Sequence, residues 1–220
     1  MDIVKGWNDI GVGFNFTFSN YYISESETKD KYCNYILEHA QNGINGVVLA
    51  SEILNRHIKK NYPKIKRIYS VTNDLRRVED YNKYTKLYDL VVLAADFNKD
   101  KEFLEGIEDK DRIEIMTNDC CIRNCPNRRR HYSQIALYNM KITEDPVFMT
   151  KEETDFTCVW RGTKEKAQGL NVLGSDDVER LSDIGFNRFK LVGRDLPSMK
   201  YMENLVKYIY NGTQEKREEL

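Results

Sequence analysis

Short apolar segments rich in β-branched residues alternate with longer polar segments along most of this chain, and that alternation limits its fold more than any other feature. From the spacing of apolar residues we predict strands at residues 11–18, 46–50, 67–71, 90–94, 112–116 and 189–192. By the same criterion we predict helices at residues 27–42, 51–61, 78–87, 101–107, 133–139 and 175–184. Strands that alternate with helices form a parallel sheet, so we expect an α/β fold.

Two α/β architectures fit six such units: an open, doubly wound sheet and a (β/α) TIM-barrel-like fold, here a short or incomplete barrel. Polar residues follow most of the predicted strands, among them Asp74, Asp96 and Asp119. Such residues also begin loops and cap helices, but their recurrence favours the barrel, whose active sites lie at the carboxyl ends of its strands. We predict one barrel domain over residues 1–210 and a charged tail at 211–220.

Charge and hydropathy exclude several classes of partner. The 34 Lys and Arg residues nearly balance the 35 Asp and Glu residues, so the net charge of −1 attracts neither nucleic acid nor anionic membrane to the molecule as a whole. No apolar run approaches the roughly 18 residues of a membrane helix, and the first residues lack the apolar core of a signal peptide. We therefore expect a cytoplasmic protein without a membrane span, and the sequence leaves its oligomeric state open.

Three of the five cysteines, Cys120, Cys121 and Cys125, lie within six positions directly after a predicted strand. An odd, clustered set of cysteines argues against a secreted disulfide framework and for metal or redox use. The Cys121-x3-Cys125 spacing predicts two sulfurs on one loop or one helical turn, and Cys120 joins them only if the backbone bends sharply. Cys158 completes a site only if it returns in space, and we expect the isolated Cys33 to be a small core residue.

From the residues alone, three interpretations of the cysteines remain open. The first is an iron–sulfur cluster of the 4Fe–4S type, and the second is a zinc site made by four thiolates or by three thiolates and His131. The third is a set of unligated thiols. The spacing does not separate the two metals, although the paired C-x2-C segments of many zinc sites are missing.

Basic residues after the cysteines are candidates for catalysis or binding. Arg128 and His131 are three residues apart, so on a helix they can face a cluster or an anionic substrate together while Arg129 and Arg130 face water. An RNA or phosphate contact is also open, although four residues make a small patch in a slightly acidic protein.

Lys190 lies inside the last predicted strand, and Arg194 follows that strand. A charged lysine is costly to bury without a partner, so we expect a salt bridge in the barrel interior, with Asp119 or Glu52, or a carboxylate substrate. The alternative is that Lys190 extends outward between helices, with its charge in water.

Two segments carry a resemblance to a known family. Asn118-Asp119-Cys120-Cys121-x3-Cys125-Pro126-x-Arg128-x-x-His131 resembles the N-E-x-C-x3-C-P-x-R-x-x-H segment of the peptidase U32 family. Residues 177–194, which end in Phe189-Lys190-Leu191-Val192-Gly193-Arg194, are similar to a second conserved strand of that family. Residues 46–52 are compatible with its early strand, so the resemblance covers most of the chain.

The resemblance implies a TIM-barrel-like fold that carries a cysteine-bound 4Fe–4S cluster. It implies cluster binding by Cys121, Cys125 and Cys158, with Cys120 or Cys33 as the fourth ligand, and zinc is the alternative metal. The active-site residues that we predict beside this cluster are Asp119, Arg128, His131, Lys190 and Arg194.

Members of this family are linked to oxygen-independent hydroxylation of RNA or ubiquinone precursors and to collagenase-type proteolysis. We therefore expect an iron–sulfur-dependent hydroxylase or oxidoreductase that acts on an organic or RNA substrate, and the alternative is a non-catalytic, metal-stabilised partner subunit. A U32-type peptidase is the weaker expectation, because no Ser/His/Asp set, H-E-x-x-H motif or paired carboxylates stand at catalytic spacing. Two departures from the family are Asp119 in place of Glu and a length below the about 250 residues of a typical barrel.

Overall fold

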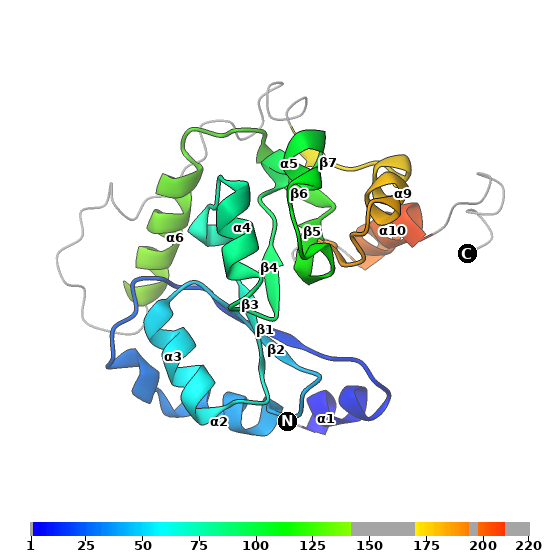
Figure 1. Ribbon diagram of the computed structural model, residues 1–220. Coiled ribbons are helices and arrows are strands. Elements are labelled where there is room, and N and C mark those ends of the chain that lie inside the picture. The colour runs from blue at the N-terminus through cyan, green and yellow to red at the C-terminus, as the bar shows by residue number, and fades with distance from the viewer. Residues whose placement is uncertain (1, 142–169, 194–197, 210–220) are drawn as a thin grey trace.

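The computed structural model describes residues 2–141, 170–193 and 198–209, and six parallel strands form its main sheet (Figure 1). These strands are β1 (Asn15–Phe18), β2 (Gly46–Leu49), β3 (Lys66–Tyr69), β4 (Leu90–Val92), β5 (Ile113–Met116) and β8 (Phe189–Lys190). All six predicted strands are confirmed, each within a few residues of its predicted bounds.

The spatial order of the strands decides between the two architectures. Neighbouring strands run β1-β2-β3-β4-β5-β8, all parallel and in chain order, and the sheet curls into a half-barrel (Figure 1). A doubly wound sheet would reverse its strand order at a switch point, whereas a barrel adds each strand on the same side. The predicted barrel-like fold is therefore confirmed as a half-barrel, and the described residues do not close it.

Helices cover the outer face of this sheet. They are α2 (Lys31–Ala40), α3 (Glu52–Asn61), α4 (Val78–Tyr84), α5 (Lys101–Glu105) and α9 (Ser175–Asp183). Short 3-10 turns lie in the connections between strands and helices, at η1 (Glu27–Lys29), η2 (Val71–Asn73), η3 (Ala95–Phe97) and η4 (Lys110–Arg112). The cap of α3 shows how the sequence starts these helices, since the Ser51 side chain accepts a hydrogen bond from the Leu54 amide.

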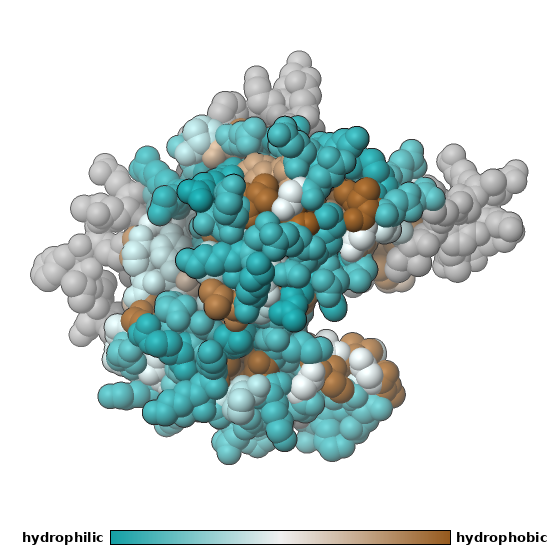
Figure 2. Space-filling view, in the orientation of Figure 1, coloured by the Kyte–Doolittle hydropathy of each residue, from teal (hydrophilic) through white to brown (hydrophobic). Residues whose placement is uncertain are grey.

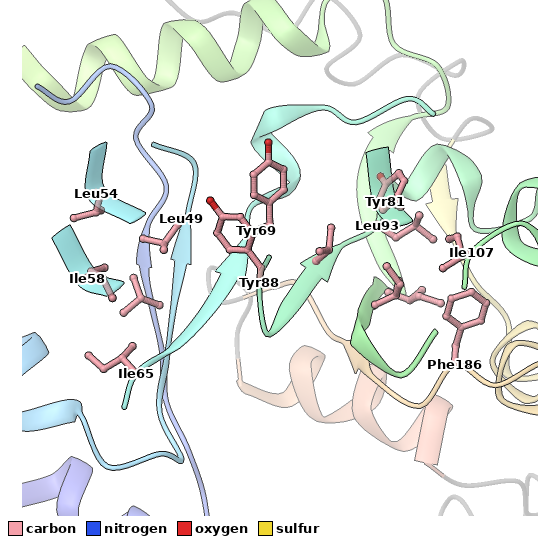
Figure 3. Packing of buried hydrophobic residues seen from close by; sticks show 14 of the residues in the cluster. Leu49, Leu54, Ile58, Ile65, Tyr69, Tyr81, Tyr88, Leu93, Ile107 and Phe186 are labelled. Atoms are coloured by element: carbon pink, nitrogen blue, oxygen red, sulfur yellow. The ribbon is translucent and has the colours of Figure 1, made fainter. Parts of the chain in front are cut away.

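Apolar side chains pack on both faces of the sheet. On the outer face, Leu54 and Ile58 of α3 lie against Leu49 of β2 (Figure 3). On the inner face a smaller cluster contains Val48, Ile68, Val92, Ala95 and Met116. This double burial explains why the strands read as short continuous apolar runs without strict alternation.

Four elements were not predicted from the sequence. They are α1 (Asp2–Asp9), α10 (Ser198–Ile209) and an antiparallel ribbon of β6 (Asn118–Ile122) and β7 (Leu170–Val172). In addition, α6 (Arg128–Lys141) begins five residues before the predicted helix at 133–139. Figure 2 shows apolar surface, in brown, on the lobe that α1 occupies in Figure 1. The exposed large hydrophobic side chains of this helix are those of Ile3 and Trp7.

The prediction that Cys121 and Cys125 share one loop or one helical turn is wrong. Cys121 lies in β6, whereas Cys125 lies in the loop that leads to α6. Asn118, Asp119 and Ile122 of this segment pair with β7, and the ribbon is irregular between Asp119 and Ile122. The partner strand lies some 50 residues further along the chain, so local spacing did not reveal it.

Four sequence predictions concern the location and the domain organisation of the chain. None of the helices in the described ranges combines the length and the apolar character that crossing a membrane requires. The tail at 211–220 lies outside the described residues. A cytoplasmic location and a single domain over 1–210 stay predictions.

Candidate functional site

A buried carboxylate organises the carboxyl end of the half-barrel. Asp96 lies in η3, directly after β4, and its side chain is 1% exposed. Its Oδ2 atom accepts hydrogen bonds from the Arg128 and Arg76 guanidiniums, the latter at 2.5 Å. Arg128, in the first turn of α6, is also buried. Two charged groups rarely stay buried unless they are paired, so this ion pair ties α6 to the end of β4.

The loop before α6 wraps around the same carboxylate. The Asn124 amide donates to Asp96 Oδ1 at 2.8 Å, and the Arg123 side chain donates to the Asp96 carbonyl at 3.2 Å. Asn124 has a left-handed backbone (φ 53°), which asparagine tolerates better than most residues. Asn171 of β7 adds a longer contact to Oδ1 at 3.4 Å. Asp96 therefore anchors the loop, α6 and the ribbon at one point.

These contacts determine the charge of both groups. Burial by itself would raise the pKa of Asp96, but the Asn124 amide and the Arg128 and Arg76 guanidiniums outweigh it and lower the pKa. Burial would lower the pKa of Arg128, but its hydrogen bond and ion pair with Asp96 raise it above the usual range. Asp96 is therefore negative and Arg128 positive at neutral pH.

Two thiols lie beside this ion pair. Cys121 is half-buried and Cys125 is buried, and neither forms a disulfide. Burial raises the pKa of Cys121, the neighbouring Arg128 opposes that rise, and Asp119 and Cys125 add to it. Cys121 and Cys125 are thus close enough to influence each other, and one guanidinium is available to stabilise a thiolate there.

The three nitrogen atoms of the Arg128 guanidinium differ in their hydrogen-bond partners. Its Nη2 atom donates to the Ile122 carbonyl at 2.8 Å, and Nη1 pairs with Asp96. Its Nε atom is buried and, within the described part of the chain, has no hydrogen-bond partner. A buried donor without a partner costs free energy, so this position suits a ligand or a thiolate that accepts the missing bond.

One turn further along α6, Tyr132 joins the same electrostatic neighbourhood. Burial first, and then the Asp119 carboxylate, raises the pKa of Tyr132 well above its usual range. The Asp119 side chain also accepts a long hydrogen bond of 3.4 Å from the Cys121 amide. The structure therefore brings Asp119, Cys121, Cys125 and Arg128 together, four of the residues that the sequence singled out.

Comparison with known proteins bears on the fold. No protein-family model and no curated protein sequence matches this chain. Its structure is similar to that of the U32 peptidase Mk0906, with a TM-score of 0.55 and 16% sequence identity over 89% of this chain and 76% of the other. The chain has a U32-like fold. At this identity the likeness establishes the fold alone.

In this U32-like fold, Lys190 has a different partner from the two expected. Its Nζ atom lies 2.9 Å from Glu114 Oε1, so the prediction that Asp119 or Glu52 pairs with it is wrong. The physical reason is register: β8 pairs with β5, Met116 lies opposite Lys190, and Glu114 projects from the same face of β5 two residues earlier. The expected salt bridge on the inner face exists, but it joins two strands of the wall.

The structure describes some of the other predicted site residues and not the rest. Arg129 and Arg130 are exposed, as predicted, and His131 is half-buried, with its amide bonded to the Asn127 carbonyl. Cys158 and Arg194 lie outside the described residues, as does the side chain of Cys120. Their roles stay predictions.

The two sequence segments that carry the family resemblance meet in space. Asn118, at the start of β6, donates to the Val192 carbonyl at 2.6 Å and accepts from the Val192 amide at 2.7 Å. This double hydrogen bond links β6 to the chain leaving β8. Asn118 therefore has a structural function that spacing alone did not reveal.

Sequence reasoning missed the residues around Asp96. Asp96 itself stood among the polar strand ends, but nothing identified Arg76, 20 residues earlier, or Asn171, 75 residues later, as its partners. The available signal was the arginine triplet at 128–130, because the helix dipole disfavours three cations at a helix start and a nearby anion offsets that cost.

The thiols supply part of a metal-ligand set. Among the described residues, no group of three or more His, Cys, Asp and Glu side chains could hold a metal ion. Cys121 and Cys125 are two soft donors beside a cationic group with a free donor, which suits thiolate ligation of iron or zinc. A metal at this position would need further ligands from residues whose side chains are not described.

Proposed function

We propose that this chain is a U32-like enzyme that holds a 4Fe–4S cluster at Cys121, Cys125, Cys158 and one further thiol, and that supports a redox or hydroxylation-type reaction on an organic or RNA substrate. One observation carries the proposal: two neighbouring thiols lie beside a buried arginine whose Nε atom has no hydrogen-bond partner among the residues that the structure describes. Thiolate ligands bring negative charge into a buried site, and Arg128 is placed to compensate it.

Cys120 is the better fourth ligand in this proposal, and Cys33 is the weaker one. Cys121 contacts Arg128 at the start of α6, whereas Cys33 lines a cavity with Asn139 and Met140 at the end of that helix. Eleven residues of α-helix span about 16 Å, far more than one cluster bridges. Burial and the Asp30 carboxylate also raise the pKa of Cys33 to about 11, which disfavours the thiolate that a metal needs.

The residues of the chain have separable roles in this scheme. When bound, the cluster would supply electron transfer, the chemistry for which proteins use such groups. Arg128 compensates the negative charge of the thiolates, and Asp96 keeps the Arg128 side chain in position. Tyr132, whose raised pKa keeps its phenol neutral, can donate a hydrogen bond to a substrate anion near Asp119.

A zinc site in a non-catalytic partner subunit is the second candidate. The observation that favours it is the burial of Cys125, which is 5% exposed, because structural zinc sites are closed to solvent. It uses the same thiols, so the metal itself distinguishes the two functions.

Anaerobic purification from cells able to build clusters, followed by iron, sulfide and zinc analysis, tests both. We expect iron and sulfide in equal amounts, together with visible absorbance. Cys121→Ser, Cys125→Ser and Cys158→Ser should each lose that absorbance, and Cys33→Ser, the matched control, should keep it. Zinc without sulfide would support the second candidate, and a protein free of both metals would contradict both.

A further inference from the structure

A second cavity opens on the other side of α6 from the thiols. It has a volume of about 440 Å³, within the roughly 300–1,000 Å³ range of small-molecule sites. Its walls come from the segment after β1, the turn after β3 and the first two turns of α6. The hydroxyls of Tyr22 and Ser133 lie 2.5 Å apart and join the first wall to the third.

The first turn of α6, which lines this cavity, has an unusual charge for the start of a helix. The first turn of α6 holds Arg128, Arg129 and Arg130 and no acidic residue, although the positive end of the helix dipole disfavours cations there. Arg128 is compensated by Asp96. Arg129 and Arg130 line the cavity, and across the described ranges no carboxylate forms an ion pair with either. Two uncompensated cations destabilise the helix unless an anion binds.

The turn after β3 contributes polar side chains to the cavity wall. Asn73 and Thr72 line the cavity from the turn after β3, and the Nδ2 atom of Asn73 is buried without a partner among the described residues. The adjacent Asp74 cannot neutralise the arginines, because it is paired with Arg76 at 2.5 Å. The cavity thus combines two cations with tyrosine, serine and threonine hydroxyls, and the Thr72 hydroxyl already donates to Ser70.

We infer that this cavity binds the phosphomonoester group of a small ligand that carries a ring. A phosphomonoester has a charge of about −1.5 to −2, which matches two guanidiniums, whereas a carboxylate compensates only one. The planar guanidinium of arginine can donate two parallel hydrogen bonds to two oxygens of one phosphate group. Tyr21 and Tyr22, whose ring centroids are 4.6 Å apart, supply an aromatic surface for the ring. This inference does not depend on a metal at Cys121.

Calorimetric titration of the purified full chain tests the inference with phenyl phosphate, inorganic phosphate and benzoate as probes. We expect phenyl phosphate to bind most tightly and benzoate most weakly. The double variant Arg129→Gln/Arg130→Gln should lose at least about tenfold in affinity for phenyl phosphate, since two charge-assisted contacts disappear. Lys59→Gln/Lys60→Gln removes the same charge from the exposed end of α3 and should bind like the parent protein.

The arginine variant should remain folded, and its melting temperature without ligand should equal or exceed that of the parent, because two cations leave a helix N-terminus. Tyr21→Ala, which removes one ring of the aromatic surface, provides a second variant and should weaken the binding of phenyl phosphate severalfold. No binding of phenyl phosphate to the parent protein would overturn the inference. Equal losses in the arginine and lysine variants, or binding of a single-stranded oligonucleotide in place of phenyl phosphate, would overturn it as well.

Discussion

At the scale of single residues, Asp96 accounts for much of the geometry at the carboxyl end of the sheet. One carboxylate receives two guanidiniums and the Asn124 amide, and it is buried together with Arg128. Breaking a buried ion pair costs far more than the pair contributes relative to apolar residues, because the remaining charge stays desolvated. Asp96 is therefore where a conservative change should have a large effect.

Replacing Asp96 with Asn tests this role. The variant leaves Arg128 without a negative partner among the described residues and leaves Arg76 with Asp74 alone, so we expect the free energy of unfolding to fall by about 3–5 kcal/mol. Urea denaturation monitored by circular dichroism measures it. Glu79→Gln, which removes an exposed partner of Arg77, is the control and should leave the denaturation midpoint unchanged. A denaturation midpoint for Asp96→Asn equal to that of the control would contradict the role of Asp96 as the anchor of the loop, α6 and the ribbon.

The pH dependence of the same pair follows from the lowered pKa of Asp96. A carboxyl group with a lower pKa in the folded state stabilises the fold above its ordinary pKa of 3.8, and this contribution is lost as the pH falls through the folded-state pKa. The stability difference between the parent protein and Asp96→Asn should therefore be constant above about pH 5 and shrink below about pH 4. Urea denaturation at pH 7 and at pH 3 compares the two, and an undiminished difference at the lower pH would show that Asp96 is not the titrating group.

At the scale of elements, the ribbon of β6 and β7 converts a linear motif into a site. It leaves the end of β5, places Cys121 beside Arg128, and is held to the end of β8 by Asn118. The same asparagine thus links two segments more than 70 residues apart. Its side chain does for β6 and β8 what a ladder of backbone hydrogen bonds does elsewhere in the sheet.

Replacing Asn118 with Ala should release this link. Two hydrogen bonds to the Val192 backbone disappear, so we expect a loss of about 1–3 kcal/mol and faster hydrogen exchange at the Val192 amide. Asn118→Asp keeps the acceptor for that amide and loses only the donor, so it should protect Val192 better than alanine does. Unchanged exchange at Val192 in the alanine variant would show that the link is not needed.

At the scale of the whole molecule, the half-barrel has central strands that are paired on both sides and two edge strands that are paired on one side. Strands β2, β3, β4 and β5 each pair with two neighbours, whereas β1 and β8 each pair with one in the described sheet. Both core clusters are built around the central strands.

We expect hydrogen exchange to follow this arrangement. The hydrogen-bonded amides of the four central strands, from β2 to β5, should exchange only with global unfolding. The paired amides of β1 and β8 should exchange faster through local opening. Native-state exchange measured by mass spectrometry or NMR resolves the two groups. Protection of β1 equal to that of β3 would indicate that the edge is covered in solution, for example by another chain.

The sequence by itself determined the α/β class and the positions of all six wall strands and their helices, because apolar periodicity and helix caps are local properties. It also singled out Cys121, Cys125, Asp119 and Arg128 as neighbours of a common site. Only the tertiary structure decided that Glu114 pairs with Lys190, that Asp96 binds Arg76 and Arg128, and that Asn118 holds the end of β8. The reason is distance along the chain: these pairings depend on sheet register and on the return of a ribbon, and no local pattern records which distant residue will satisfy a buried charge.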